Sequence, residues 1–114
     1  MRTVTIGVSS VEEASARVLA AFRGEKRGAF ISFPSVEGLW TVLTPRRWAL
    51  IRALAGQEPM SLRAVARLLD RDVKNIHADV HALLNAGILD RTDDERIVFP
   101  YDAVHVDFTI GKAA

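Results

Sequence analysis

The chain has 114 residues, 49% of them hydrophobic and 25% charged, and this length and composition predict one compact domain with a core of its own. The formal net charge is only +1 and cysteine is absent, which excludes disulfides and thiolate metal sites and leaves no overall attraction to a polyanion. There is no apolar run long enough to span a bilayer and no signal-peptide core after Met1 and Arg2, so we expect a cytoplasmic protein with no membrane partner.

The N-terminal part of the chain carries signals for a strand, a helix and a second strand. "TVTIGV" at residues 3–8 alternates valine and isoleucine with smaller or polar residues, which is typical of a strand. Ser10 and Glu13 have capping-box spacing, and the apolar residues after them recur at helical spacing as far as Gly24. "AFISF" at residues 29–33 is a second apolar run, which predicts another strand.

Two helices are expected next. Ser35 could cap the first, although an internal glycine weakens this prediction. Its expected buried residues are Val36, Leu39, Trp40 and Leu43. Thr44 followed by proline favours the start of the second helix and Gly56 favours its end. Its expected apolar stripe is Trp48, Ile51, Leu54 and Ala55. We expect Arg46 and Arg47, off this stripe, to be solvated, and both tryptophans to anchor the core rather than stack on bases.

Residues 61–89 predict two helices joined by a short turn. Ser61 caps "LRAVARLLD", which has an apolar inner face and carries Arg63 and Arg67 on its outer face. Asp72 is placed to cap the next helix. The expected buried residues of that helix are Val73, Ile76, Val80, Leu83 and Leu84. Two helices joined by so short a turn must cross steeply, which is the helix-turn-helix arrangement.

A hairpin and a last strand follow these helices. "ILDRT" and "RIVFP" flank the polar tip "DDE" and predict the hairpin, which gives the winged form of the helix-turn-helix. "AVHVDFTI" at residues 103–110 alternates apolar and polar residues and predicts a half-buried strand. We therefore predict an α/β (α+β) fold with two parts. Residues 44–114 form a winged helix-turn-helix domain with the C-terminal strand, and residues 1–43 form an N-terminal strand-helix-strand extension.

The polar face of the second helix is the candidate DNA-reading surface, because an α-helix fits the major groove of B-DNA. Asn can pair bidentately with adenine, Lys can reach guanine, and His can donate to a base or a phosphate. The base-facing candidates are Lys74, Asn75, His77 and His81. The candidates for phosphate contacts are Arg63, Arg67 and Arg71, with Arg91 and Arg96 at the base of the acidic hairpin tip. An excess of positive charge lies on this middle segment of the chain.

Two features of the same helix have alternative interpretations. Asp79 would repel a phosphate, so we expect it to pair with a neighbouring arginine or to accept from a cytosine amino group. His77 and His81 are four residues apart, a spacing that can hold zinc, and His105 and Asp107 are the further ligands in that alternative. Histidines near phosphates need no metal, however, and the stretch lacks the glutamate of a metalloprotease. We assign no metal, no cofactor and no catalytic residue, and we do not expect an enzyme.

"LRAVARLLDRDVKNIHADVHALLNAGIL" resembles the winged helix-turn-helix of prokaryotic transcription regulators of the MarR, ArsR and DeoR kinds. The matching residues are Ala66, Leu69, Asp72, Ile76, Val80, Leu83, Ala86, Gly87 and Leu89. "IHADV" is similar to the DeoR-type pattern with an aspartate in the recognition helix. Together with "FPSVEGLWTVLTPRRWALIRALAG" and "VFPYDAVHVDF", most of residues 33–110 resembles a small family of predicted bacterial and archaeal regulators often found beside toxin-like genes. The chain lacks the cysteines of many ArsR-type metal sensors and the long flanking helices by which MarR proteins dimerise.

The resemblance implies a sequence-specific double-stranded DNA-binding regulator: a dimeric, autoregulating repressor of antitoxin type, with a cognate toxin protein as a further partner. A dimer is expected because two half-sites about 34–36 Å apart need two recognition helices. We expect residues 1–43, alone or with the strand at 103–110, to form the dimer surface. The alternative function is a winged-helix protein–protein interaction module, toxin-neutralising or for assembly, that does not bind DNA. The low net charge and the acidic hairpin tip favour this alternative.

Overall fold

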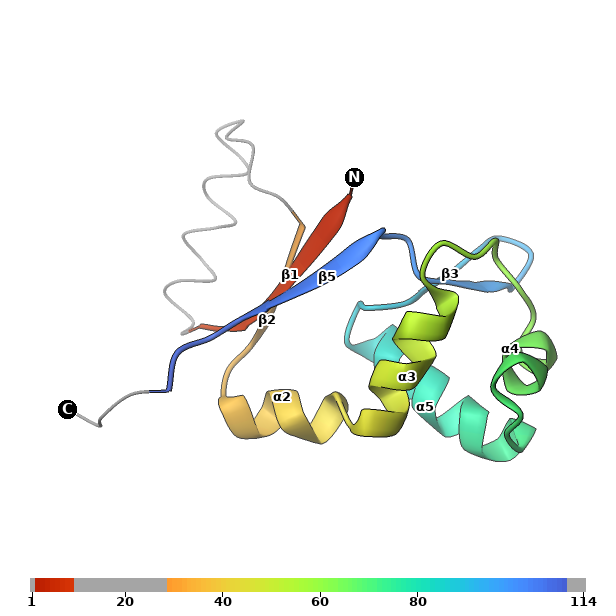
Figure 1. Cartoon of the computed structure of the whole chain (residues 1–114), viewed down its shortest axis with the longest axis horizontal. Coiled ribbons are helices and arrows are strands. Elements are labelled where there is room, and N and C mark those ends of the chain that lie inside the picture. The colour runs from red at the N-terminus through yellow and green to blue at the C-terminus, as the bar shows by residue number, and fades with distance from the viewer. Residues whose placement is uncertain (1, 10–28, 111–114) are drawn as a thin grey trace.

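The computed structural model describes residues 2–9 and 29–110, which form a mixed α/β structure with a three-stranded sheet beside a group of helices (Figure 1). The strands of the sheet are β1 (Thr3–Val8), β2 (Ala29–Phe33) and β5 (Ala103–Asp107). Their order is β2-β1-β5, and both pairs are parallel. The three strands expected from the sequence are present, although β5 ends at Asp107, three residues before the expected end at residue 110. The helix expected from Ser10 to Gly24 lies outside the described residues.

The described helices are α2 (Val36–Val42), α3 (Pro45–Leu54), α4 (Leu62–Leu69) and α5 (Val73–Asn85). The expected cap precedes each of them. The side-chain oxygens of Ser35, Thr44, Ser61 and Asp72 accept hydrogen bonds from backbone N–H groups of the first helical turn. After α5, β3 (Asp90–Arg91) and β4 (Ile97–Val98) pair antiparallel, which confirms the hairpin. None of these described helices is long and apolar enough to cross a membrane.

β1 lies at the centre of the sheet, and its sequence suits that place. Val4 and Ile6 are fully buried. Gly7 has to be glycine, because a Cβ there would meet the Asp107 carbonyl oxygen of β5 at 2.6 Å. Just before β1, the backbone N–H of Arg2 donates to Asp102 Oδ2 at 2.6 Å. The sheet therefore combines β1 and β2, which precede the expected domain boundary between residues 43 and 44, with β5, which follows it.

The core of the molecule runs from the sheet through α2 and α3 to α4, α5 and the hairpin. As predicted, α5 buries Ile76, Val80 and Leu83 on one face. Leu50 of α3 is also fully buried, although it lies off the predicted stripe. Below the hairpin, Ile88, Leu89, Ile97 and Phe99 close the core. The hairpin is attached to the chain before α4 by a backbone pair between Met60 and Ile97, with N···O distances of 3.0 and 2.7 Å.

Two residues expected in the core, Trp40 and Val73, are exposed, so these two predictions are wrong. Trp40 is 52% exposed, because it directly follows the buried Leu39 and so lies about 100° further round a helix that buries only one residue. Its ring meets that of Phe108 edge-on, with centroids 6.0 Å apart. Val73 is 41% exposed, because it is the first residue of α5 and lies at the turn, where α4 does not cover it.

Candidate nucleic-acid interface

The exposed face of α5 carries all four residues predicted to face bases. Lys74, Asn75, His77 and His81 are exposed, while the opposite face of the helix packs into the core. The rings of His77 and His81, one turn apart, lie with their centroids 4.2 Å apart and tilted by 38°. The helix therefore presents a row of hydrogen-bond donors and acceptors on a support held by buried apolar residues.

Asp79 lies at the edge of this face and is held by two arginines. Arg47 of α3 donates from Nε to Asp79 Oδ1 at 3.0 Å, and Arg71 of the turn donates from Nη2 to Oδ2 at 2.8 Å. The ion pair predicted for Asp79 is confirmed. The prediction that Arg47 is solvated is wrong: its side chain is only 20% exposed, and Nη1 also donates to the Val42 carbonyl oxygen at 3.0 Å.

The Arg47–Asp79–Arg71 cluster ties α3, the α4–α5 turn and α5 together. Burial raises the pKa of the Asp79 carboxyl, but the hydrogen bonds and charges of Arg71 and Arg47 together outweigh burial and lower that pKa below its ordinary value. The carboxylate is therefore ionised throughout the physiological range. Because two guanidinium groups share one carboxylate, the cluster keeps one positive charge beside the exposed face of α5.

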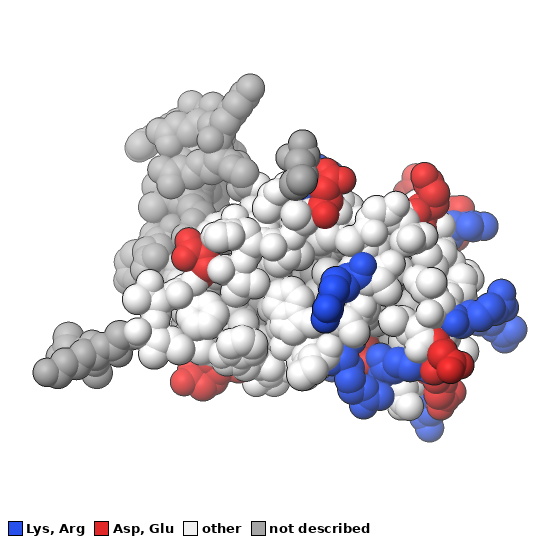
Figure 2. Space-filling view, viewed as in Figure 1, with Lys and Arg blue, Asp and Glu red and all other residues white. Residues whose placement is uncertain are grey.

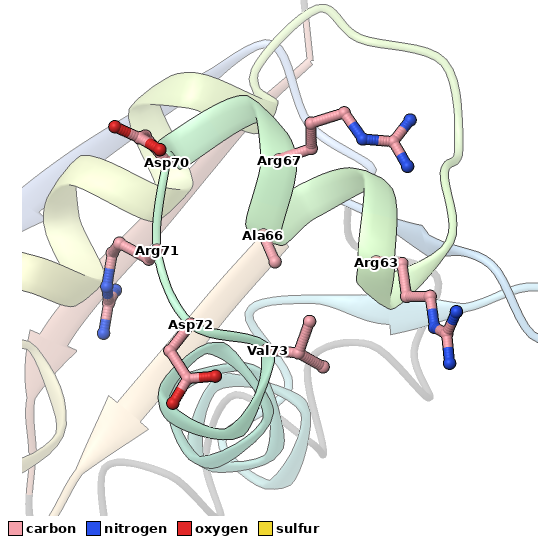
Figure 3. A pocket seen from close by; sticks show the side chains of 7 residues that line it. All are labelled: Arg63, Ala66, Arg67, Asp70, Arg71, Asp72 and Val73. Atoms are coloured by element: carbon pink, nitrogen blue, oxygen red, sulfur yellow. The ribbon is translucent and has the colours of Figure 1, made fainter.

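A hollow of about 580 Å³ lies between α4 and the start of α5, and three of the arginines predicted to contact phosphates line it (Figure 3). Its lining residues are Arg63, Ala66, Arg67, Asp70, Arg71, Asp72 and Val73. Arg63 and Arg67 project from α4 on the same side and are exposed, while Arg71 points to the other side of the turn (Figure 3). The exposed side chains of the two α4 arginines can therefore reach a phosphate. Arg71 donates from Nη2 to Asp79.

The turn beside this hollow has a defined geometry. Asp70 ends α4 in the left-handed conformation, with φ 51°, and its N–H donates to carbonyl oxygens of the last helical turn. The N–H of Arg71 donates to the Ala66 carbonyl oxygen at 2.9 Å. Asp72 then caps α5. These bonds satisfy the carbonyl oxygens of Ala66 and Arg67 and the N–H of Lys74, and they fix the conformation of the turn between the two helices.

The hairpin contributes a mixture of charges. Its tip residues Asp93, Asp94 and Glu95 are exposed, and Arg96 Nε pairs with Asp94 Oδ2 at 3.1 Å. The Thr92 hydroxyl, which donates to Asp94, is the main cause of a lowered pKa of that carboxyl. Arg91 lies exposed on β3. Of the two arginines predicted to hold phosphates from the hairpin, only Arg96 therefore has a carboxylate partner within the described residues.

Positive charge is unevenly distributed between the helical part of the surface and the part near the sheet. Figure 2 shows that most Lys and Arg side chains of this face lie over its helical half, with Asp and Glu among them. Almost no Lys or Arg side chain lies over the half near the sheet.

Within residues 2–9 and 29–110 there is no group of three or more His, Asp or Glu side chains that could hold a metal ion. His105 and Asp107 lie on β5 and do not join His77 and His81, so the zinc site considered from the sequence is not formed there.

A family model described as HVO_A0114 matches residues 42–106, from the end of α2 into β5. This match covers more than half of the chain. The chain belongs to the HVO_A0114 family. The HVO_A0114 region contains α3, α4, α5 and the hairpin, and with them every residue assigned above to the candidate interface. No curated protein and no solved structure matched the chain.

Sequence reasoning missed one member of this interface. Arg47 lies 32 residues from Asp79, and no local pattern connects the two. The one available signal was chemical: an aspartate on a face of neutral and basic residues needs a partner, and Arg47 is a cation near the start of a neighbouring helix. Which arginine would reach it depended on how α3 crosses α5.

Proposed function

We propose that this protein is a sequence-specific double-stranded DNA-binding transcription regulator of the winged helix-turn-helix type, acting as a dimeric autoregulating repressor. The observation that carries the proposal is the two-sided character of α5. One face of it is fixed in the core by Ile76, Val80 and Leu83, and the other offers lysine, asparagine and histidine side chains to solvent. A short turn from α4 precedes this helix and a hairpin follows it, an order that fits a recognition helix with a wing.

The residues divide into two roles in this proposal. Lys74, Asn75, His77 and His81 enter the major groove and read base edges. Arg63 and Arg67 hold phosphates beside it, and they carry no sequence information themselves. The Arg47–Asp79–Arg71 cluster positions α5 and adds its remaining positive charge.

The hairpin takes a limited part in binding. Its acidic tip is repelled by phosphates, so the contact falls to Arg91 at its base, while Arg96 stays engaged with Asp94. The regulatory mechanism is steric: the protein occupies a promoter operator and excludes the transcription machinery.

The first test is binding of the purified protein to the DNA upstream of its own gene and to random duplex of equal length, at two salt concentrations. We expect preference for the upstream DNA and weaker binding at the higher salt, because phosphate contacts release counterions. Absence of binding to both duplexes at low salt would contradict the proposal.

Two substitutions separate the two roles. Asn75→Ala should reduce discrimination between operator and random duplex, with a loss on the operator of about 1–3 kcal/mol. Arg67→Ala should weaken binding to both duplexes alike. Gln57→Ala, on the exposed loop after α3, is the control and should change neither. Equal losses at every site for the first two variants would contradict the division of roles.

The acidic hairpin tip favours a second candidate function, a protein–protein interaction module that neutralises a toxin or serves assembly. The resemblance to regulators found beside toxin-like genes supports such a partner. Co-expression with the product of the neighbouring gene, followed by affinity purification, tests it. We expect a stable complex if the module binds that protein. Reversal of the tip charge by Asp93→Lys should weaken a complex that uses the tip and leave one that uses another surface unchanged.

A further inference from the structure

The outer edge of β5 has the features of a strand that pairs with another chain. β5 is the last strand in the order β2-β1-β5, and in the described part of the chain no strand covers its other edge. The strand "AVHVD" contains no lysine or proline, two residues that proteins use to prevent pairing at an edge. The backbone of this edge is therefore open to a further strand.

The alternation of the backbone groups determines which residues face that open edge. The N–H of Ala103 donates to the Arg2 carbonyl oxygen at 3.4 Å, and the Asp107 carbonyl oxygen lies against Gly7 of β1. Because successive residues of a strand direct their N–H and C=O groups to alternate sides, Val104 and Val106 direct theirs away from β1. A strand added at this edge would pair with those two residues.

Exposed apolar side chains gather near the same edge. Within the described residues, five large apolar side chains are more than one-third exposed, and three of them lie on or near the β5 segment: Trp40 at 52%, Val106 at 37% and Ile110 at 75%. Trp40 belongs to this group because its ring contacts Phe108, just after β5. Val106 shares the side of the strand on which Val104 lies, and Ile110 follows three residues after the end of β5. The edge thus combines unpaired backbone with apolar surface.

We infer that a second copy of this chain pairs with this edge, with β5 antiparallel to β5 of the second copy across a twofold axis at Val106. In this register Val106 faces Val106, and Val104 faces Phe108. On the other side of the strands, His105 faces Asp107 of the second copy, and Asp107 faces His105. Both side chains are exposed in the single chain, so they are free to meet.

The charges favour this register over its neighbours. A twofold axis at Asp107 would place two carboxylates opposite each other, and one at His105 would place two imidazoles opposite each other. Like charges directly opposite destabilise an antiparallel pair, while opposite charges stabilise it. An axis at Val106 also makes the two copies of Val106 a hydrogen-bonded pair, because the N–H and C=O groups of Val106 point away from β1. The result is one sheet of six strands, β2-β1-β5-β5-β1-β2.

This inference takes from the proposed function only the expectation that the protein is a dimer, and it specifies the dimer surface. It does not depend on DNA binding. It places the contact on strand β5, within the wider region of residues 1–43 and 103–110 that the sequence suggested. The helices with the candidate DNA-contacting residues lie at the other end of the molecule from the sheet (Figure 1). Both copies of α5 are therefore left uncovered by the contact.

The first test is cross-linking through Val106→Cys in the full chain, which has no cysteine of its own. A hydrogen-bonded antiparallel pair brings the two Cα atoms to about 5.5 Å, within the range that a disulfide spans. We expect mild oxidation to yield a covalent dimer, and Gln57→Cys, on an exposed loop, to yield far less. Equal cross-linking of the two variants, or none from Val106→Cys, would overturn the inference.

The second test measures the dimer dissociation constant by analytical ultracentrifugation without DNA. His105→Asp should weaken the dimer about tenfold, because both cross-strand pairs change from attraction to repulsion. The double change His105→Asp with Asp107→His should restore it, and Gln57→Asp should leave it unchanged. A monomeric wild type, or a His105→Asp variant that dimerises as the wild type does, would overturn the inference. A dimer that binds no DNA would instead contradict the proposed function alone.

Discussion

The helical region and the sheet region of this protein meet solvent in different ways. Among the described residues, every Lys and Arg except Arg2 lies in the helical region, between Arg46 and Arg96 (Figure 2). The sheet region and its neighbour α2 carry only Arg2 of these cations, and they expose tryptophan, valine and isoleucine beside the edge of β5, which no described strand covers. The first surface suits a hydrated, charged partner that is read through side chains. The second suits a partner that is joined through backbone and apolar contacts.

The largest expected difference between the regions concerns burial. Leu83→Ala should lower the free energy of unfolding by about 2–5 kcal/mol, because Leu83 is fully buried between α5 and the rest of the core. Trp40→Ala should lower it by no more than about 1 kcal/mol, because half of that side chain is exposed and it stabilises mainly through Phe108. Urea denaturation at one fixed protein concentration measures both. Equal losses would mean that Trp40 is a core residue in solution.

A smaller loss is expected from the polar cluster of the helical region. Asp79→Ala should lower the free energy of unfolding by about 1–3 kcal/mol, because Arg47 and Arg71 are left partly buried without their shared carboxylate. Asp93→Ala at the exposed hairpin tip is the matched control and should change it by no more than about 0.5 kcal/mol. If both variants unfolded at the same urea concentration as the wild type, the cluster would have no part in stability.

The same carboxylate predicts a dependence of stability on pH. The pKa of Asp79 is lowered in the folded protein, so its contribution is present above the unfolded pKa, about 3.9, and is lost as pH falls through the folded value. The difference in unfolding free energy between the wild type and Asp79→Asn should therefore be constant near neutral pH and should shrink below about pH 4. A pH series of denaturation curves measures it. A difference that grows on acidification would contradict the lowered pKa.

The smallest expected effect concerns the salt dependence of DNA binding. If Arg67 holds a phosphate as proposed, Arg67→Ala should reduce the slope of log affinity against log salt by about 1, because that contact is lost. Arg52→Ala should leave the slope unchanged, because Arg52 lies on α3 beside Asp102 and Ala103, on the side of the sheet region. Binding titrations at several salt concentrations provide both slopes. If Arg52→Ala reduced the slope as much, the positive surface used for DNA would extend to the sheet.

Features set by neighbouring residues could be predicted from the sequence. The caps Ser35, Thr44, Ser61 and Asp72 act within one helical turn, so their residue type and spacing were enough. The exposed polar face of α5 followed from helical periodicity in the same way.

Features that depend on how distant elements meet could not be predicted. Trp40 had the spacing of a core residue, but the short α2 leaves it uncovered. The pairing of Arg47 with Asp79 required the crossing of α3 and α5. The strand after the hairpin was predicted, while its parallel pairing with β1 is a property of the whole chain. For the candidate site, the exposed residues of α5 and an arginine partner for Asp79 were predictable, and the identity of Arg47 as a second partner was not.

The pairing of β1 with β5 has a consequence for the order of folding. It joins residues about one hundred positions apart, as the contact of Arg2 with Asp102 illustrates, so closing it requires a loop of nearly the whole described chain. The contacts among α3, α4, α5 and the hairpin are much more local. During synthesis β1 leaves the ribosome before any of these helices and β5 after all of them, and local contacts form faster than distant ones. We therefore expect the helical region to fold before β5 is available to pair with β1. The newly made chain then forms α5 before it completes its sheet.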